Sequence, residues 1–270
     1  MTNVNTNNIS DAAICEITEA GIATITLNRP DIHNAFDDVL IADLTAKIET
    51  LNTDPAVRVI ILTGAGKSFS AGADLNWMKR MAGYSHAENL ADSRALAKLM
   101  KVLNFSSKPT IALVNGAAFG GGVGLAACCD IVIASDRASF CLSEVKLGLI
   151  PAVISPYVVE AIGVNQARRY FLTAERFNAQ TAQQIGLVHE VVSGDELTAR
   201  GQEMAKILLA NGPDAMHAAK NLIYAVANKP ISDAVIDDTA QRIADQRASG
   251  EGREGIRAFL EKRPANWSKK

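Results

Sequence analysis

Residues 109–140, PTIALVNGAAFGGGVGLAACCDIVIASDRASF, place a glycine cluster between two apolar runs. The runs on either side, PTIALVNGAA and DIVIASDRASF, are typical of strands that are buried on both faces of a sheet. Four glycines fall within positions 120–124, and no charge follows them until Asp130. A strand, a glycine turn with a helix behind it, and a second strand indicate a parallel sheet covered by helices.

The same alternation of strands and helices extends toward the N-terminus. Residues 12–30 alternate apolar and polar side chains around Gly21, which predicts a β-hairpin. Apolar residues at three- and four-residue spacing predict a helix over 35–52, and a further helix is expected over 87–103. VRVIILTGAG, residues 57–66, is another continuous apolar run and predicts a further buried strand. The fold class is therefore α/β.

Beyond residue 195 the strand pattern ends. Asn-Gly-Pro and Lys-Pro breaks separate three predicted helices over 197–210, 213–228 and 231–249. We therefore divide the chain into a core of residues 1–195 and a helical C-terminal region of residues 196–270. The apolar stripes of these helices need a partner, either the core or another subunit.

The composition excludes several classes of function. The chain has 270 residues, 48% of them hydrophobic, and a net charge of −2, which gives no field to attract nucleic acid or an anionic membrane. No run of 18 apolar residues predicts a membrane span, and the polar start lacks the apolar region of a secretion signal. Its four cysteines have no metal-ligand spacing, which favours free core residues in the cytoplasm and no metal site.

Two stretches imitate nucleotide sites. The order of GKS, residues 66–68, is that of a Walker A end, but the pattern needs a glycine where Ile61 stands. GVGLAA, residues 122–127, fits G-x-G-x-x-A, yet NGAAFG separates it from the preceding apolar run. The plain alternative is that these glycines admit the close approach of a neighbouring helix.

A different role for the small residues comes from two strand-to-helix turns, FSAGADL (69–75) and FGGGVG (119–124). Backbone N–H groups at such turns are not yet used by the helix that follows. Two convergent N–H groups form an oxyanion hole, which stabilises the charge that develops when a thioester carbonyl is activated. Only glycine or alanine lets the backbone approach that oxygen closely.

Glu144 is the candidate for proton transfer beside such a hole. It interrupts the largely apolar stretch SFCLSEVKLGLIPAV, residues 139–153, and is expected to be partly buried. Burial raises a carboxyl pKa toward neutrality, where the group can move protons. The alternative is an ion pair with Lys146. The four histidines are scattered, and no G-x-S-x-G elbow is present.

Six stretches follow one another along the chain: LNRPDIHNAF, VIILTGAGKSFSAGADLNWM, PTIALVNGAAFGGGVGLAACCDIVIAS, FCLSEVKLGLIPAVISPYVVEAIG, RRYFLTAERFNAQTAQQIGLVHEVV and AFLEKRPANW. Together they resemble the enoyl-CoA hydratase/isomerase, or crotonase, superfamily over residues 9–267. The resemblance implies a spiral of repeated ββα units with a helical C-terminal trimerisation region. It also implies a homotrimer or a dimer of trimers, and an acyl-CoA substrate with no metal or other cofactor.

The resemblance assigns roles to individual residues. In the family's pattern the oxyanion-hole amides belong to the residue after the glycine of S-A-G-A-D and to the middle glycine of G-G-G, here Ala73 and Gly121. The carboxylate of the later segment matches Glu144, the third catalytic residue. Substrate contacts are implied for Arg29, Ala71, Gly72, Asp74, Leu75, Gly120 and Gly124. Lys146 joins them because of its charge and its position beside Glu144 in the sequence.

Gly124 departs from the family's hydratases, which commonly carry a glutamate at that position as well as at Glu144. A single carboxylate suits a Δ3,Δ2-enoyl-CoA isomerase, because one base can lift a proton and return it elsewhere. As a hydratase, a lone Glu144 would act as acid and base through its two oxygens, with less help in orienting the water. A third alternative is an acyl-CoA- or RNA-binding protein with weak catalysis; the near-neutral charge argues against RNA.

Closer likeness favours the hydratase. CLSEVKLGLIPAVISPYVVEAIG, RRYFLTAERF and ACCD look most like the bacterial methylglutaconyl-CoA hydratase group of leucine breakdown. We therefore expect a hydro-lyase that adds water to a 2-enoyl-CoA, with 3-methylglutaconyl-CoA as the substrate. Lys146 or Arg29 would receive the second carboxylate of that acyl group.

Overall fold

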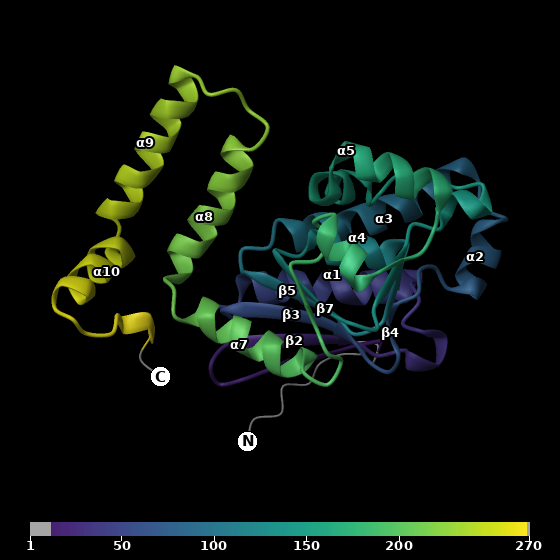
Figure 1. Cartoon of the computed structure of the whole chain (residues 1–270), viewed down its shortest axis with the longest axis horizontal. Coiled ribbons are helices and arrows are strands. Elements are labelled where there is room, and N and C mark those ends of the chain that lie inside the picture. The colour runs from purple at the N-terminus through teal and green to yellow at the C-terminus, as the bar shows by residue number, and fades with distance from the viewer. Residues whose placement is uncertain (1–11, 269–270) are drawn as a thin grey trace.

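The apolar runs of the sequence form two sheets in the computed structural model, which describes residues 12–268 (Figure 1). The larger sheet has the order β1 (Ala13–Ile17), β2 (Ile22–Leu27), β3 (Val59–Gly64), β5 (Thr110–Val114), β7 (Ile131–Ser135) and β10 (Glu190–Val192). The smaller sheet has the order β4 (Ser68–Ser70), β6 (Ala117–Phe119), β8 (Ser139–Cys141) and β9 (Phe177–Asn178). Strands β1 and β2 form the predicted antiparallel hairpin, and the others of the larger sheet run parallel from β2 onward. The α/β class is confirmed.

Two stretches that we predicted as single strands each contain two. PTIALVNGAA holds β5 and β6, and DIVIASDRASF holds β7 and β8. The first is broken at Gly116, where an added Cβ would overlap the carbonyl of Lys67. The second is broken by the turn at 136–138, closed by a hydrogen bond from the Ala138 N–H to the Ser135 carbonyl (2.9 Å). The second strand of each pair joins the smaller sheet, which produces the repeated ββα unit.

Helices follow the strand pairs where the apolar periodicity predicted them. The expected helices over 35–52 and 87–103 are α1 and α3, and the side chain of Asp37 and a capping box of Ser85 with Glu88 begin them. The helices are η1 (Pro30–Ile32), α1 (Asp38–Thr53), α2 (Leu75–Met81), α3 (His86–Asn104), α4 (Gly121–Cys128), η2 (Glu144–Leu147), α5 (Ser155–Thr173), α6 (Ala179–Gln184), α7 (Leu197–Leu209), α8 (Pro213–Val226), α9 (Asp233–Ala248), α10 (Gly250–Leu260) and η3 (Asn266–Ser268).

Both faces of the larger sheet are covered (Figure 1). The main core lies between this sheet and helices α1, α3, α4 and α5. A second cluster on the opposite face packs α7, through Leu197 and Ala205, onto Ile61, Ile111 and Ile133. Burial on two sides explains why β3, β5 and β7 read as continuous apolar runs.

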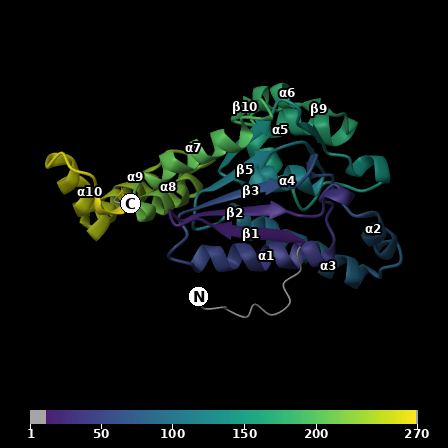
Figure 2. The ribbon, with the colours of Figure 1, turned by 90° about the horizontal axis from the view of Figure 1, so that it is seen from below.

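Helices α8 to α10 project away from the two sheets (Figures 1 and 2). Lys220 of α8 forms an ion pair with Asp130 (2.9 Å), and the Tyr224 hydroxyl donates to the carbonyl of Asn104 (2.9 Å). The predicted division of the chain at residue 195 falls before α7, which packs onto the core. We predicted three C-terminal helices, whereas residues 196–268 form four α-helices; the fourth was missed because the glycines of α10 weaken its helical pattern.

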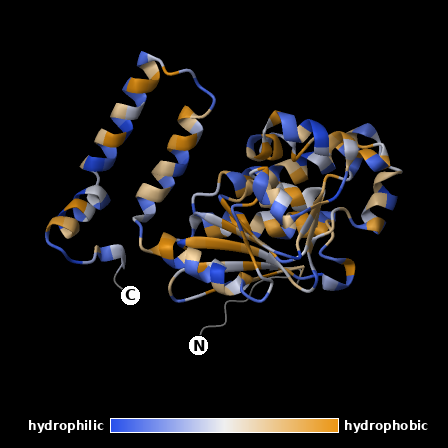
Figure 3. Ribbon diagram, viewed as in Figure 1, coloured by the Kyte–Doolittle hydropathy of each residue, from blue (hydrophilic) through white to orange (hydrophobic). Residues whose placement is uncertain are grey.

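Hydrophobic residues recur along helices α8 to α10 (Figure 3). Several apolar side chains of this region are exposed, most of all Ile231 (88%) between α8 and α9, and Phe259 (82%) and Leu260 (73%) at the end of α10. Between residues 12 and 268, no helix combines the length and the hydropathy that crossing a membrane requires.

Candidate active site

The turn after β2 forms one wall of the candidate site. Asn34 is buried and adopts a left-handed conformation (φ 54°), which asparagine tolerates better than most residues. Its Oδ1 accepts the backbone N–H of Arg29 (2.8 Å), and its Nδ2 donates to the carbonyls of Ala65 (2.9 Å) and Ser68 (2.7 Å). This side chain therefore ties the turn to the start of β4. Our sequence reasoning missed Asn34, because none of these partners is implied by its neighbours.

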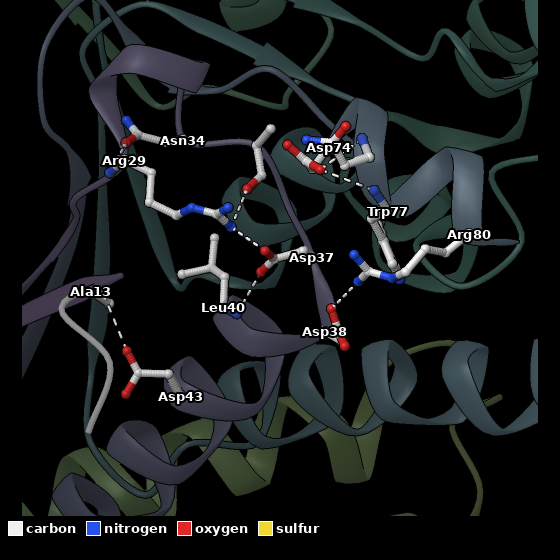
Figure 4. Close-up of polar contacts among 12 residues, drawn as sticks. Ala13, Arg29, Asn34, Asp37, Asp38, Leu40, Asp43, Asp74, Trp77 and Arg80 are labelled. Atoms are coloured by element: carbon white, nitrogen blue, oxygen red, sulfur yellow. Dashed lines mark hydrogen bonds and ion pairs between the residues drawn. The ribbon is translucent and has the colours of Figure 1, made fainter. Parts of the chain in front are cut away.

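Arg29, expected to contact the CoA portion, is held inside the protein. Its guanidinium forms an ion pair with Asp37 (2.7 Å) and donates to the carbonyl of Ala35 (3.4 Å; Figure 4). About a quarter of the side chain is exposed. Any anion that approaches Arg29 therefore competes with the Asp37 carboxylate.

The first predicted amide donor, Ala73, is fixed by a backbone bridge to Phe36. The Phe36 N–H donates to the carbonyl of Gly72 (2.7 Å), and the Asp74 N–H donates to the carbonyl of Phe36 (2.7 Å). Because these bonds flank Ala73 in a parallel bridge, its own N–H points away from Phe36. That N–H has no hydrogen-bond partner in the described part of the chain. Gly72 has φ 94°, a conformation that favours glycine.

Asp74 and Leu75, both expected to contact substrate, begin helix α2. The Asp74 carboxylate is buried and accepts the N–H groups of Asn76 (2.9 Å) and Trp77 (3.0 Å; Figure 4). Trp77 is buried and donates through Nε1 to Asp92 of α3 (3.2 Å). Asp74 therefore caps the helix that follows Ala71–Ala73, while Leu75 is 72% exposed.

The second predicted donor, Gly121, is the first residue of α4. Gly120 before it has φ 50° and donates its N–H to the carbonyl of Cys141 (2.9 Å). The Gly121 N–H has no partner between residues 12 and 268. A Cβ on Gly121 would lie 3.2 Å from the Phe36 ring. Phe36 therefore adjoins both turns, and it brings the segments of Ala73 and Gly121 together.

Glu144 begins η2 beside the second turn. A Cβ on Gly120 would lie 3.2 Å from Glu144 Oε1, while Oε2 is buried and has no hydrogen-bond partner among residues 12–268. Burial raises the pKa of this carboxyl, and a hydrogen bond with its own backbone opposes that shift. Lys146 is exposed, and the described residues show no ion pair between it and Glu144. The carboxylate is therefore available for proton transfer.

Gly124, where the family's hydratases carry a second glutamate, has no room for a side chain. An added Cβ would overlap Cγ2 of Ile154 and would lie 2.9 Å from its Cβ and 3.3 Å from Cε of Met100. Ile154 and Met100 are both buried. Ile154 therefore occupies the space that a glutamate at position 124 would need. Nothing in the residues around Gly124 or Ile154 indicates this contact.

The positions of the strands show that neither of the two stretches resembling nucleotide-binding motifs has the structure that its motif requires. Ile61 is buried within β3, so no loop of Walker A length precedes residues 66–68. Our reason against the dinucleotide motif was wrong, because Ala117–Phe119 is itself a strand that ends at the glycines. The motif fails for another reason: its first glycine, Gly122, lies inside α4.

The four cysteines are free, and three of them are buried. Burial raises the pKa of the Cys129 thiol to about 12, and it also raises the pKa of Cys128. Across residues 12–268, no group of three or more His, Cys, Asp or Glu side chains is placed to hold a metal ion.

Comparison with known proteins gives a consistent result. The family model for "Enoyl-CoA hydratase/isomerase" matches residues 17–270. The crystal structure of an enoyl-CoA hydratase from Shewanella pealeana is 48% identical, with a TM-score of 0.92 over 95% of this chain and 96% of that one. A crotonyl-CoA hydratase of Syntrophomonas wolfei is 35% identical over 93% of this chain and 96% of its own length. A 2,3-dehydroadipyl-CoA hydratase of Escherichia coli is 35% identical over 90% of this chain and 93% of its own.

Proposed function

The chain belongs to the enoyl-CoA hydratase/isomerase family, and we propose that it is a hydratase that adds water reversibly to 3-methylglutaconyl-CoA, a short, branched 2-enoyl-CoA. The observation that carries this proposal is the unpartnered Oε2 of Glu144 beside two turns whose N–H groups are free. The substrate supplies the coenzyme A group, so no further cofactor enters the reaction.

The amides of Ala73 and Gly121 would hold the thioester oxygen. Both N–H groups lie at strand-to-helix turns, and neither donates a hydrogen bond to any residue that the structure describes. Hydrogen bonds to that oxygen draw electron density out of the conjugated double bond and stabilise the enolate formed when water adds at C3. Removal of one such donor in other enzymes lowers kcat by about 10²–10³.

Glu144 would carry the protons. Its ionised carboxylate takes a proton from the water that attacks C3, and a carboxyl oxygen then returns a proton to C2. The raised pKa brings the two protonation states of Glu144 closer in free energy, which favours a group that must both accept and donate.

The substrate's second carboxylate needs a cation near Glu144. Lys146 is exposed and has no ion pair in the described chain, whereas Arg29 is already paired with Asp37. Arg176 stacks its guanidinium over the ring of Phe119, 4.8 Å from the centroid. The charges of Lys146 and Arg176 both lower the pKa of Cys141, against the larger effect of burial. We therefore favour Lys146 and Arg176 as the groups that receive the carboxylate.

The projecting helices α8 to α10 support a trimer or a dimer of trimers, because their exposed apolar side chains would be covered by another copy of the chain. Light scattering of the purified protein would give the mass of the assembly. The cytoplasmic location stays a prediction.

The competing activity is Δ3,Δ2-enoyl-CoA isomerisation, and the observation that favours it is the lack of a carboxylate at Gly124. Purified protein is assayed with 3-methylglutaconyl-CoA, crotonyl-CoA and 3-hexenoyl-CoA. We expect hydration of the first at the highest kcat/KM. Turnover of 3-hexenoyl-CoA alone would refute the hydratase and establish the isomerase.

A further inference from the structure

Helices α4 and α5 contact each other along a line that starts beside Glu144. Gly120, Gly124 and Cys128 are spaced four residues apart, so they lie on one face of α4. Glu144 lies against the first of these positions, and Ile154, the N-cap of α5, lies against the second.

At Gly124 the side chain of Ile154 leaves no free space between α4 and α5. Ile154 is 3% exposed, and its Cβ would lie only 2.9 Å from a Cβ on Gly124. The helices therefore meet here as closely as a glycine allows. An apolar group that extends from the thioester past Glu144 along this face of α4 would reach the Ile154 side chain.

A pocket opens one helical turn beyond that contact. Its volume is about 210 Å³, and it lies where the C-terminal end of α4 faces α5 and α8. The α4 and α5 sides are formed by Ala127, Cys128, Cys129, Tyr157, Glu160 and Ala161. The step from Gly124 to Cys128 is about 6 Å along the helix axis. Ile154 thus stands between the Glu144 carboxylate and this pocket.

We propose that Ile154 sets the length of the acyl group by closing the acyl site off from the α4–α5–α8 pocket. This inference rests on the proposed function, since it takes the acyl group to pass Glu144. Short straight chains, and the methyl branch of 3-methylglutaconyl-CoA, end against the Ile154 side chain, which is apolar and fixed by the core. Longer straight chains would have to enter the pocket, and Ile154 blocks the way.

Truncation of Ile154 should join the two spaces. Ile154→Ala removes three carbon atoms, so methylenes beyond C4 could pass toward Ala127 and Ala161. Each methylene newly buried is worth about a fourfold gain in binding. Two such methylenes correspond to a rise of about 15-fold in kcat/KM for a C8 substrate relative to C4.

The test measures hydration of straight-chain 2-enoyl-CoA thioesters of C4, C6, C8 and C10 by wild type, Ile154→Ala, Ile154→Val and Ile111→Ala. Ile111 is fully buried on the opposite face of the larger sheet, in the cluster that packs against α7, so it controls for a loosened core. We expect the C8-to-C4 ratio of kcat/KM to rise about 15-fold in Ile154→Ala and less in Ile154→Val. In Ile111→Ala it should stay at the wild-type value. An unchanged ratio in a folded Ile154→Ala protein would overturn the proposal, and so would an equal rise in Ile111→Ala.

Binding of saturated acyl-CoA separates this inference from the hydratase itself. Butyryl-CoA and octanoyl-CoA are titrated calorimetrically into wild type, Ile154→Val and Ile154→Ala. If wild type hydrates no 2-enoyl-CoA of any length, the proposed function fails, but a selective gain for octanoyl-CoA in the variants would still support the role of Ile154. If Ile154→Ala does not fold, Ile154→Val decides, and no gain for octanoyl-CoA there contradicts the proposal.

Discussion

Replacement of Gly124 by alanine tests whether Ile154 fills that position. In the interior of a helix, alanine is normally more stable than glycine by about 0.5–1 kcal/mol. Here the new Cβ would overlap Cγ2 of Ile154 and lie 2.9 Å from its Cβ, which is attached directly to the backbone. Overpacking of this kind costs about 1–3 kcal/mol. We therefore expect Gly124→Ala to lower the free energy of unfolding by about 1–2 kcal/mol.

The cost of this substitution should fall once Ile154 is trimmed. Ile154→Ala alone creates a cavity and should cost about 2–5 kcal/mol. In that background the overlap with Cγ2 is gone, while the Cβ of residue 154 still lies 2.9 Å from the new Cβ, so Gly124→Ala should be less destabilising than in wild type. The two changes should therefore be coupled by about 1 kcal/mol.

The assay is equilibrium unfolding in urea of wild type, both single variants and the double variant, all at one protein concentration so that oligomerisation does not shift the result. Gly250→Ala is the matched control, because no atom lies within 4 Å of a Cβ built there. Wild-type stability of Gly124→Ala, together with additive free energies in the double variant, would refute our account of this contact.

Four further predictions concern the site. Because Glu144 must be ionised to accept a proton and burial raises its pKa, the acid limb of kcat/KM should lie at a higher pH than for an exposed glutamate; a limb at the usual glutamate pKa would contradict this. Because the pKa of Glu144 is higher in the folded than in the unfolded protein, its contribution to stability is largest below the unfolded pKa and is lost as the pH rises through the folded pKa. Glu144→Gln should therefore have a Tm at pH 7 no lower than that of wild type. Asp74→Ala removes the cap of α2 and should cost about 0.5–2 kcal/mol in urea. It should also lower kcat, since the Ala73 turn leads into that helix. An unchanged kcat would show that the Asp74 cap does not help to position the Ala73 N–H. Lys146→Ala should raise KM for 3-methylglutaconyl-CoA and leave crotonyl-CoA unaffected, and equal effects on both substrates would remove Lys146 from recognition of the carboxylate.

Much of the fold follows from local patterns in the sequence. The apolar runs at 57–66 and 109–114 predict strands because burial on both faces removes polar alternation. The short strands of the smaller sheet escape that reasoning. Ala117–Phe119 lies three residues after β5, and only the backbone contact at Gly116 shows that the chain has passed from one sheet to the other.

The site divides in the same way. Small residues at two strand-to-helix turns predict free N–H groups, and an acidic residue in an apolar stretch predicts a partly buried carboxylate, so the two turns and Glu144 were identified from local sequence. The family resemblance then named Ala73 and Gly121 within those turns. Ile154 was not, because its contact with Gly124 joins residues thirty positions apart and depends on how closely α5 approaches α4. Phe36 was missed for the same reason, since its bridge to Ala73 spans two ββα units.

The initial rate of hydration of 3-methylglutaconyl-CoA by wild type and by Glu144→Gln tests the central claim most directly. Glutamine keeps the size of the side chain but neither accepts nor donates the transferred proton, so we predict a loss of about 10²–10⁴ in kcat with folding intact. Undiminished hydration by a folded Glu144→Gln protein would show that another group moves the protons.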